Sequence, residues 1–170
     1  MTLDRYRMFA AYNAWANGRI YDACASLPEA AYKADRNAFF GSLHGTLTHV
    51  LVADRIWMRR LTGEGPSYDR LDVELADDLA TLQAMRLIED ARIRAYVDAI
   101  DPAALDEPYG YANMSGVALE QTLSSALDHV FNHQTHHRGQ AHGLLSLAGV
   151  EPPALDLVYF QREAGITRTV

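Results

Sequence analysis

Four long segments of the sequence place apolar side chains three and four residues apart, which is the spacing of one face of an α-helix. They cover about residues 2–26, 43–61, 73–100 and 119–148, and little of the chain alternates as a strand would. Each segment has a polar face opposite its apolar stripe, so each must bury one side against the others. The pattern predicts an all-α fold, an antiparallel four-helix bundle, formed by a single domain over residues 1–170.

The segments between these helices carry turn signals. Ser42 is the predicted N-cap of the second helix, which stops at the glycines and proline of "TGEGP". The preceding stretch "EAAYKADRNAFFG" is a connection with at most one short helical turn. Between the third and fourth helices, "EPYGYANMSGVAL" alternates aromatic and small residues, which predicts a short β-hairpin or an extended loop. The segment "ALDLVYFQRE" predicts a short terminal helix.

Charge and hydropathy exclude several classes of protein. The net charge is −7, and the basic residues, of which only Lys33 is a lysine, form no cluster, so nucleic acid is not an expected partner. No apolar run approaches the roughly 18–20 residues that a membrane span needs. Charged residues near the N-terminus rule out a signal peptide, and the single Cys24 suits a reducing compartment. The expected location is the cytoplasm.

The stretch "HVFNHQTHHRGQAH" contains five of the seven histidines. Because positions four apart lie on one side of a helix, His129, His133 and His137 form a row, and this row falls within the apolar face. His136 lies at the border of that face and His142 points away. An imidazole pair at i and i+4 can bind one divalent metal ion, although such a pair is also common without a metal.

The second helix offers a third ligand for such a site. His49 lies at the edge of its buried half and can face the interior of the bundle, where His133 and His137 are expected. The sequence therefore favours a divalent-metal site made by these three residues, with ordinary core histidines as the alternative. The same projection places on one exposed side His44, Thr48, Arg55 and Arg59.

Other polar residues on the inner faces have less specific roles. Asp54 is interpreted as a structural partner of an arginine, with support of a ligating histidine as the alternative. Glu89 is expected to pair with the nearby Arg86. His129 could replace one of the other ligands, support the metal site or be a core histidine with satisfied hydrogen bonds, and the last two roles together are favoured. Arg138 is a cation and so no metal ligand, but it could hold a substrate carboxylate or a neighbouring acid.

Four pieces of the chain, "YNAWAN", "GSLHGTLTHVLVADRIWMRRLTG", "NHQTHHRGQAHGLL" and "PPALDLVYF", resemble the DinB/YfiT-like family of damage-inducible helical bundle proteins. The resemblance implies an antiparallel four-helix bundle in which three histidines of the second and fourth helices bind a divalent metal. The matching positions are His49, His133 and His137. Zinc and nickel both suit imidazole ligands.

The resemblance also implies a function in the response to stress. Family members of known activity are metal-dependent thiol transferases that use bacillithiol, mycothiol or glutathione, and some relatives are isomerases. Three protein ligands leave coordination positions open, where a thiol or a water can lose its proton. Two alternatives stay open: a hydrolase assisted by Asp54 or Glu89, and a non-catalytic protein with a structural or sensory metal. No catalytic residue is assigned.

Self-association is a further expectation. Met8, Tyr12 and Trp15 lie outside the stripes that face the bundle and would leave an apolar patch exposed. Such a patch favours a second copy of the chain as its cover, and the resemblance implies a homodimer as well. The expected partners are thus a small-molecule thiol and a second copy, with neither nucleic acid nor membrane.

Overall fold

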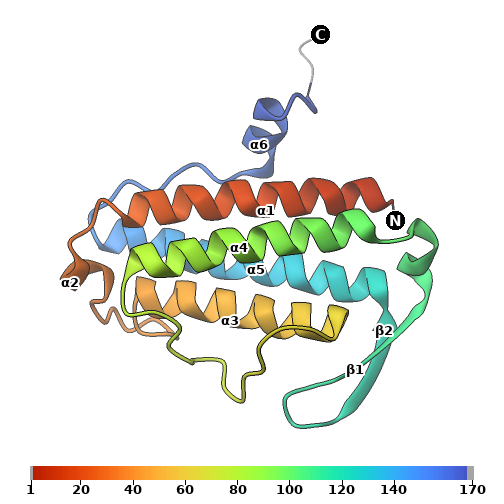
Figure 1. Cartoon of the computed structure of the whole chain (residues 1–170). Helices are drawn as coiled ribbons and strands as arrows, with labels where there is room; N and C mark the ends of the chain where they lie inside the picture. The colour runs from red at the N-terminus through yellow and green to blue at the C-terminus, as the bar shows by residue number, and fades with distance from the viewer. Residues whose placement is uncertain (1, 168–170) are drawn as a thin grey trace.

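The computed structural model describes residues 2–167, and four long helices make up its body (Figure 1). They are α1 (Leu3–Cys24), α3 (Leu43–Thr62), α4 (Leu79–Ala99) and α5 (Leu123–Leu147). The antiparallel pairs α1 with α4 and α3 with α5 pack closely and form the predicted bundle (Figure 1). Because α3 and α4 run in the same direction, the connection between them has to return along the length of α3 (Figure 1).

Side-chain caps fix where the helices begin, and they correct two predicted boundaries. Ser42 caps α3 as expected, since its Oγ accepts a hydrogen bond from the Gly45 amide at 3.0 Å. The third long helix begins at Leu79 rather than at residue 73, because the Asp78 carboxylate accepts the Thr81 amide at 2.8 Å. The last long helix begins after its cap, Thr122, rather than at residue 119.

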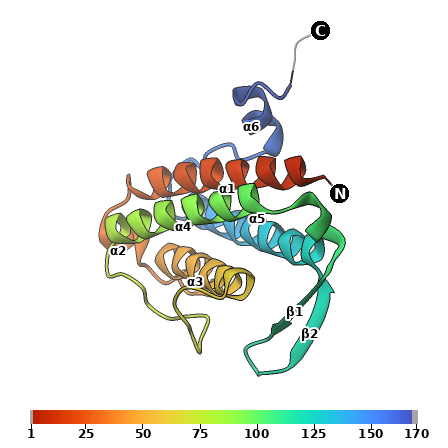
Figure 2. The ribbon, with the colours of Figure 1, turned by 45° about the vertical axis from the view of Figure 1, so that its right-hand side comes forward.

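The residues before that cap form a β-hairpin, which confirms the strand alternative for this stretch. Strands β1 (Pro108–Ala112) and β2 (Ala118–Thr122) pair in antiparallel register. The turn is closed by Asn113, whose Oδ1 accepts the amides of Ser115 and Val117 at 2.9 and 3.0 Å. Leu119, with which the fourth helix was predicted to begin, is an exposed strand residue. The hairpin extends away from the bundle on the side of α3 (Figure 2).

Three short helical elements complete the described part of the chain: α2 (Glu29–Tyr32), the 3-10 helix η1 (Pro102–Asp106) and α6 (Leu157–Glu163). The predicted terminal helix is α6, and its Phe160 packs against the cluster that contains Met8, Tyr12 and Trp15. The expectation that these three side chains leave an exposed patch is therefore wrong, because the chain covers them itself. The homodimer stays a prediction that rests on the resemblance.

Two apolar clusters fill the bundle, one at each end. The first surrounds Tyr6, Met58 and Phe131, and the second surrounds Ile20, Leu51 and Leu145. Between them, buried polar side chains cross the interior from all four long helices: Asn13, Asn17, Asp54, Arg86, Glu89, Asp90, Gln134 and Arg138. Within residues 2–167, no helix is both long and apolar enough to cross a membrane.

Candidate metal centre

Three imidazole rings converge between α3 and α5. His49 comes from α3, and His133 and His137 are one turn apart on α5. The Nε2 atom of His49 lies 3.3 Å from that of His133 and 3.2 Å from that of His137, and the last two are 3.0 Å apart. His49 and His137 are buried and His133 is half-buried. The structure thus brings together the three side chains that the sequence selected.

Hydrogen bonds to the other ring nitrogens fix the orientation of two of these rings. The Nδ1 atom of His49 lies 3.0 Å from the carbonyl oxygen of Leu71, and Nδ1 of His137 lies 2.8 Å from Oε1 of Gln140. Carbonyl oxygens only accept, so both Nδ1 atoms carry the proton and donate. The Nε2 atoms of these neutral rings are left with free lone pairs that face one another.

Burial keeps the three rings neutral. It lowers the pKa of His49, of His137 and, to about 3, of His133, where the neighbouring histidines lower it further. Like-oriented lone pairs at these separations repel unless a cation lies between them. The donor set is therefore one that a metal ion stabilises, since metal ligands must be deprotonated imidazoles.

The separations of the nitrogen atoms also fit a metal. Two nitrogens at about 2.0–2.1 Å from an ion lie about 3.3–3.4 Å apart in tetrahedral and about 2.9 Å apart in octahedral geometry. The three Nε2 separations, 3.0 to 3.3 Å, lie within this range. The three histidines are a group that could hold one metal ion.

Two residues outside the long helices hold the site and were missed at the level of sequence. Leu71 belongs to the connection that returns along α3 to the start of α4, called the returning connection below. Its backbone carbonyl oxygen contacts His49. Phe40 stacks on the His49 ring at 3.8 Å between centroids and 16° between planes, and it meets His137 edge-on at 5.7 Å. Helical periodicity says nothing about such residues, because the path of the connections brings them there.

A cavity of about 470 Å³ opens beside His49 and His133. Its walls come from α3, α5, the returning connection and the hairpin turn. The lining residues are His49, Ala53, Ile56, Trp57, Arg60, Leu71, Tyr111, Asn113, Met114, Ser115, His129 and His133. Among the described residues neither aspartate nor glutamate lines this cavity, and it gives a small molecule access to His49 and His133.

His129 does not join the three converging rings. Its side chain is exposed and stacks on Trp57 at 4.8 Å, while its ring centroid lies 5.8 Å from that of His133. It lines the cavity, so the alternative of a core histidine is wrong. The exposed position predicted for His44 is also wrong, because Tyr32 of α2 packs edge-on against its ring at 5.3 Å and buries it. Thr48, predicted on the same exposed side, is buried too.

Asp54 has the structural role that the sequence favoured. Its Oδ2 atom lies 2.5 Å from Nη1 of Arg86 and also accepts a hydrogen bond from the Gln134 amide. Arg86 reaches Asp90 at 3.0 Å with its other terminal nitrogen. Because Arg86 is engaged in this way, the predicted pair with Glu89 is wrong. Glu89 faces other cations of the bundle instead, Arg55 at 3.6 Å and Arg92 at 3.1 Å.

Arg138 is bound within the protein rather than directed at the converging histidines. It is buried on α5 and donates to the amide oxygens of Asn13, Asn17 and Gln134. The two asparagines reach Asp90 through their Nδ2 atoms at 3.5 and 3.0 Å. Arg86 and Arg138 are thereby joined through Asp90 and the asparagine amides into one buried polar network.

Comparisons with known proteins agree with this architecture. The model of the DinB family matches residues 1–169. Protein DinB of Bacillus subtilis (strain 168) is 29% identical over 142 residues, which is 81% of this chain and 83% of that protein. A crystal structure of a DinB-like protein from Bacillus cereus ATCC 10987 superposes with a TM-score of 0.62 at 20% identity, covering 86% of this chain and 94% of the other. This last likeness shows a shared fold.

Proposed function

Because the chain belongs to the DinB family, we propose that His49, His133 and His137 bind one zinc or nickel ion and that the protein is a metal-dependent thiol S-transferase. The observation that carries the proposal is the convergence of three Nε2 lone pairs beside a cavity that His49 and His133 line. The resemblance of the sequence supplies the reaction class, and a small-molecule thiol is the proposed substrate.

The residues of the chain prepare the site for this chemistry. When bound, a divalent metal with three imidazole ligands supplies an open coordination position at which the pKa of a thiol falls. Leu71 and Gln140 hold two imidazoles in the tautomer that directs Nε2 inward. Phe40 covers one face of the His49 ring, and Trp57 lines the cavity beside the site. These contacts hold the imidazole rings in place before a metal or a substrate binds.

The structure weakens the case for the alternative of a hydrolase. Asp54 and Glu89, the two acids named for that reaction, are held by arginines in the interior of the bundle. Neither lines the cavity next to the histidines, and that lining contains no other carboxylate. A thiol transferase would not need these acids, because a metal held by the three histidines would lower the pKa of a thiol, whose proton could then pass to water.

The test is an assay of S-conjugation with metal-stripped protein and with protein reloaded with zinc or nickel. Cysteine, glutathione, bacillithiol and mycothiol are each offered together with an alkylating electrophile. We expect turnover that requires both metal and thiol, that His137→Ala abolishes and that His142→Ala retains. Loss of thermal stability on chelation without metal-restored turnover would instead support a structural metal. Metal-restored ester hydrolysis without thiol would support a hydrolase.

A further inference from the structure

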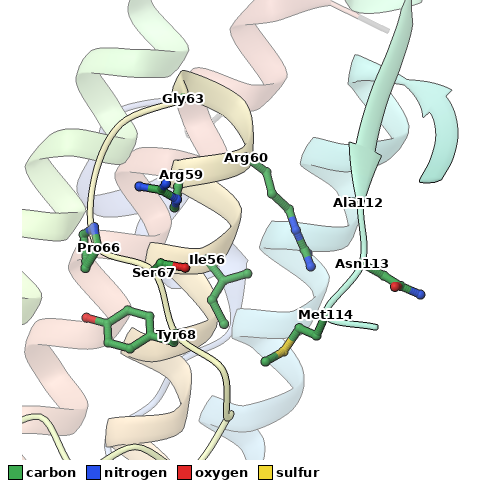
Figure 3. A pocket seen from close by; sticks show the side chains of 10 residues that line it. All are labelled: Ile56, Arg59, Arg60, Gly63, Pro66, Ser67, Tyr68, Ala112, Asn113 and Met114. Atoms are coloured by element: carbon green, nitrogen blue, oxygen red, sulfur yellow. The ribbon is translucent and has the colours of Figure 1, made fainter. Parts of the chain in front are cut away.

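The cavity beside the histidines shares part of its wall with a second cavity farther along α3, and we call the two together the groove. The second cavity has a volume of about 440 Å³. Figure 3 shows its side chains, contributed by the end of α3, the start of the returning connection and the hairpin turn. The residues that line both cavities are Ile56, Arg60, Asn113 and Met114. A ligand at His133 can therefore extend toward Arg60.

Arg60 occupies the wall that the two cavities share. Its side chain extends from α3 toward the hairpin (Figure 3), and its guanidinium carbon lies 4.7 Å from the ring of Trp57 and 5.2 Å from that of Tyr111. The two rings are themselves in contact, with centroids 5.1 Å apart, so the flat cation lies against both of them. It is half-buried, and within residues 2–167 no carboxylate lies at ion-pair distance from it. Burial lowers the pKa of Arg60, as expected for a cation that has lost water without gaining a counter-ion.

The charges around the groove favour an anion. Within residues 2–167 no acidic side chain lines either cavity. Arg59 adds a second cation to the outer cavity, where it donates to the carbonyl of Gly65. A separate cavity beside Phe40 has the opposite character, because Asp72 and Glu74 line it. The groove is thus a cationic exception on a chain of net charge −7.

We propose that Arg60 binds a carboxylate of the small molecule that occupies this groove and thereby selects acidic ligands over neutral ones. One guanidinium balances one carboxylate, and its planar fork can donate two parallel hydrogen bonds to it. Trp57 and Tyr111 hold the fork in place, which reduces the entropy lost on binding. The proposal rests on the proposed function, which places the reacting sulfur of the same ligand at the three histidines.

The experiment measures binding of two matched pairs of ligands to the metal-loaded protein by ligand-observed NMR and calorimetry. The first pair is 3-mercaptopropionate and its methyl ester, and the second is butyrate and methyl butyrate, which lack the thiol. We expect roughly 10- to 100-fold tighter binding of each acid than of its ester. Arg60→Gln should abolish this preference by weakening only the acids, with the metal content unchanged.

Two further variants control the result. Arg94→Gln removes the same charge from an exposed position on α4 and should keep the full preference. Arg60→Lys keeps the charge without the planar fork and should retain part of the preference for acids. This variant tests the same carboxylate contact if Arg60→Gln folds poorly. An acid-to-ester ratio that is equal in the parent and in both Arg60 variants would overturn the proposal.

The two ligand pairs separate this proposal from the proposed function. If thiols bind no better with metal than without it, but both acids still depend on Arg60, the thiol chemistry fails and the carboxylate site stands. If thiol binding requires the metal while acids and esters bind alike, the carboxylate site fails and the thiol chemistry stands.

Discussion

Two polar clusters lie side by side in the bundle, one between α3 and α5 and one shared by all four long helices, and they are built on opposite principles. The network around Asp54 and Arg86 matches each charge with an opposite charge or an amide. The three histidines instead direct acceptor nitrogens at one another. His133 and Gln134 are neighbours in sequence, yet one belongs to each cluster. A cluster whose charges are matched within the protein needs no partner from outside, whereas lone pairs that face one another call for a cation between them.

The largest effect that separates the clusters is expected from Asp54→Ala. Removal of this carboxylate leaves Arg86, which is fully buried, without one of its partners, and breaking a buried pair costs about 3–5 kcal/mol of folding free energy. Urea unfolding monitored by circular dichroism measures this loss. Metal binding by the folded variant should stay unchanged.

The control for that substitution is Asp106→Ala, which removes an exposed aspartate and should change stability by no more than about 0.5 kcal/mol. Loss of metal from Asp54→Ala at unchanged stability would contradict the division between the two clusters.

A smaller effect is expected from Gln140→Leu, which acts on the histidine cluster through one of its supports. The variant removes the acceptor of the His137 Nδ1 proton, and such a loss typically lowers metal affinity about 10- to 100-fold. Competition with a chromophoric chelator measures the affinity. His136→Ala is the matched control, because it removes the other bond of Gln140 and leaves the contact with His137 in place. Equal affinities of Gln140→Leu and the parent would show that this contact does not support the site.

The smallest effect concerns pH. Burial lowers the pKa of His133 to about 3, so below the ordinary value of about 6.5 the unfolded chain binds a proton that the folded chain does not. The contribution of His133 to the free energy of unfolding of the metal-free protein is therefore fully present above about pH 6.5. It falls as the pH is lowered, by about 2 kcal/mol between pH 7.5 and pH 5. Urea unfolding at the two pH values should show this extra loss in the parent relative to His133→Asn. Equal losses would mean that His133 is not held neutral by the fold.

The parts of the molecule that the sequence predicted are those governed by helical periodicity. The 3.6-residue repeat gave the four long helices and set His49, His133 and His137 on facing sides, because ligands on regular helices keep their spacing. The boundary errors at residues 73 and 119 arose where apolar residues continue the pattern outside the helix. The capping residues Asp78 and Thr122 decide those ends.

Contacts made by connections could not be predicted in this way. Leu71, Phe40 and the surroundings of Arg60 depend on the path of segments without a repeating pattern. The burial of His44 has the same cause, since α2 folds back over the start of α3. The exact partners within the polar layer were also beyond the sequence, because several acids and arginines share the inner faces of the helices and only packing chooses among them.

The central claim is that the three converging histidines bind one metal ion. The most direct measurement is the metal content of purified protein that has been loaded with zinc or nickel and freed of excess metal, for the parent, His49→Ala, His137→Ala and His142→Ala. The account predicts about one ion per chain in the parent and in His142→Ala, and almost none in the other two variants. Full metal content in both His49→Ala and His137→Ala would contradict it.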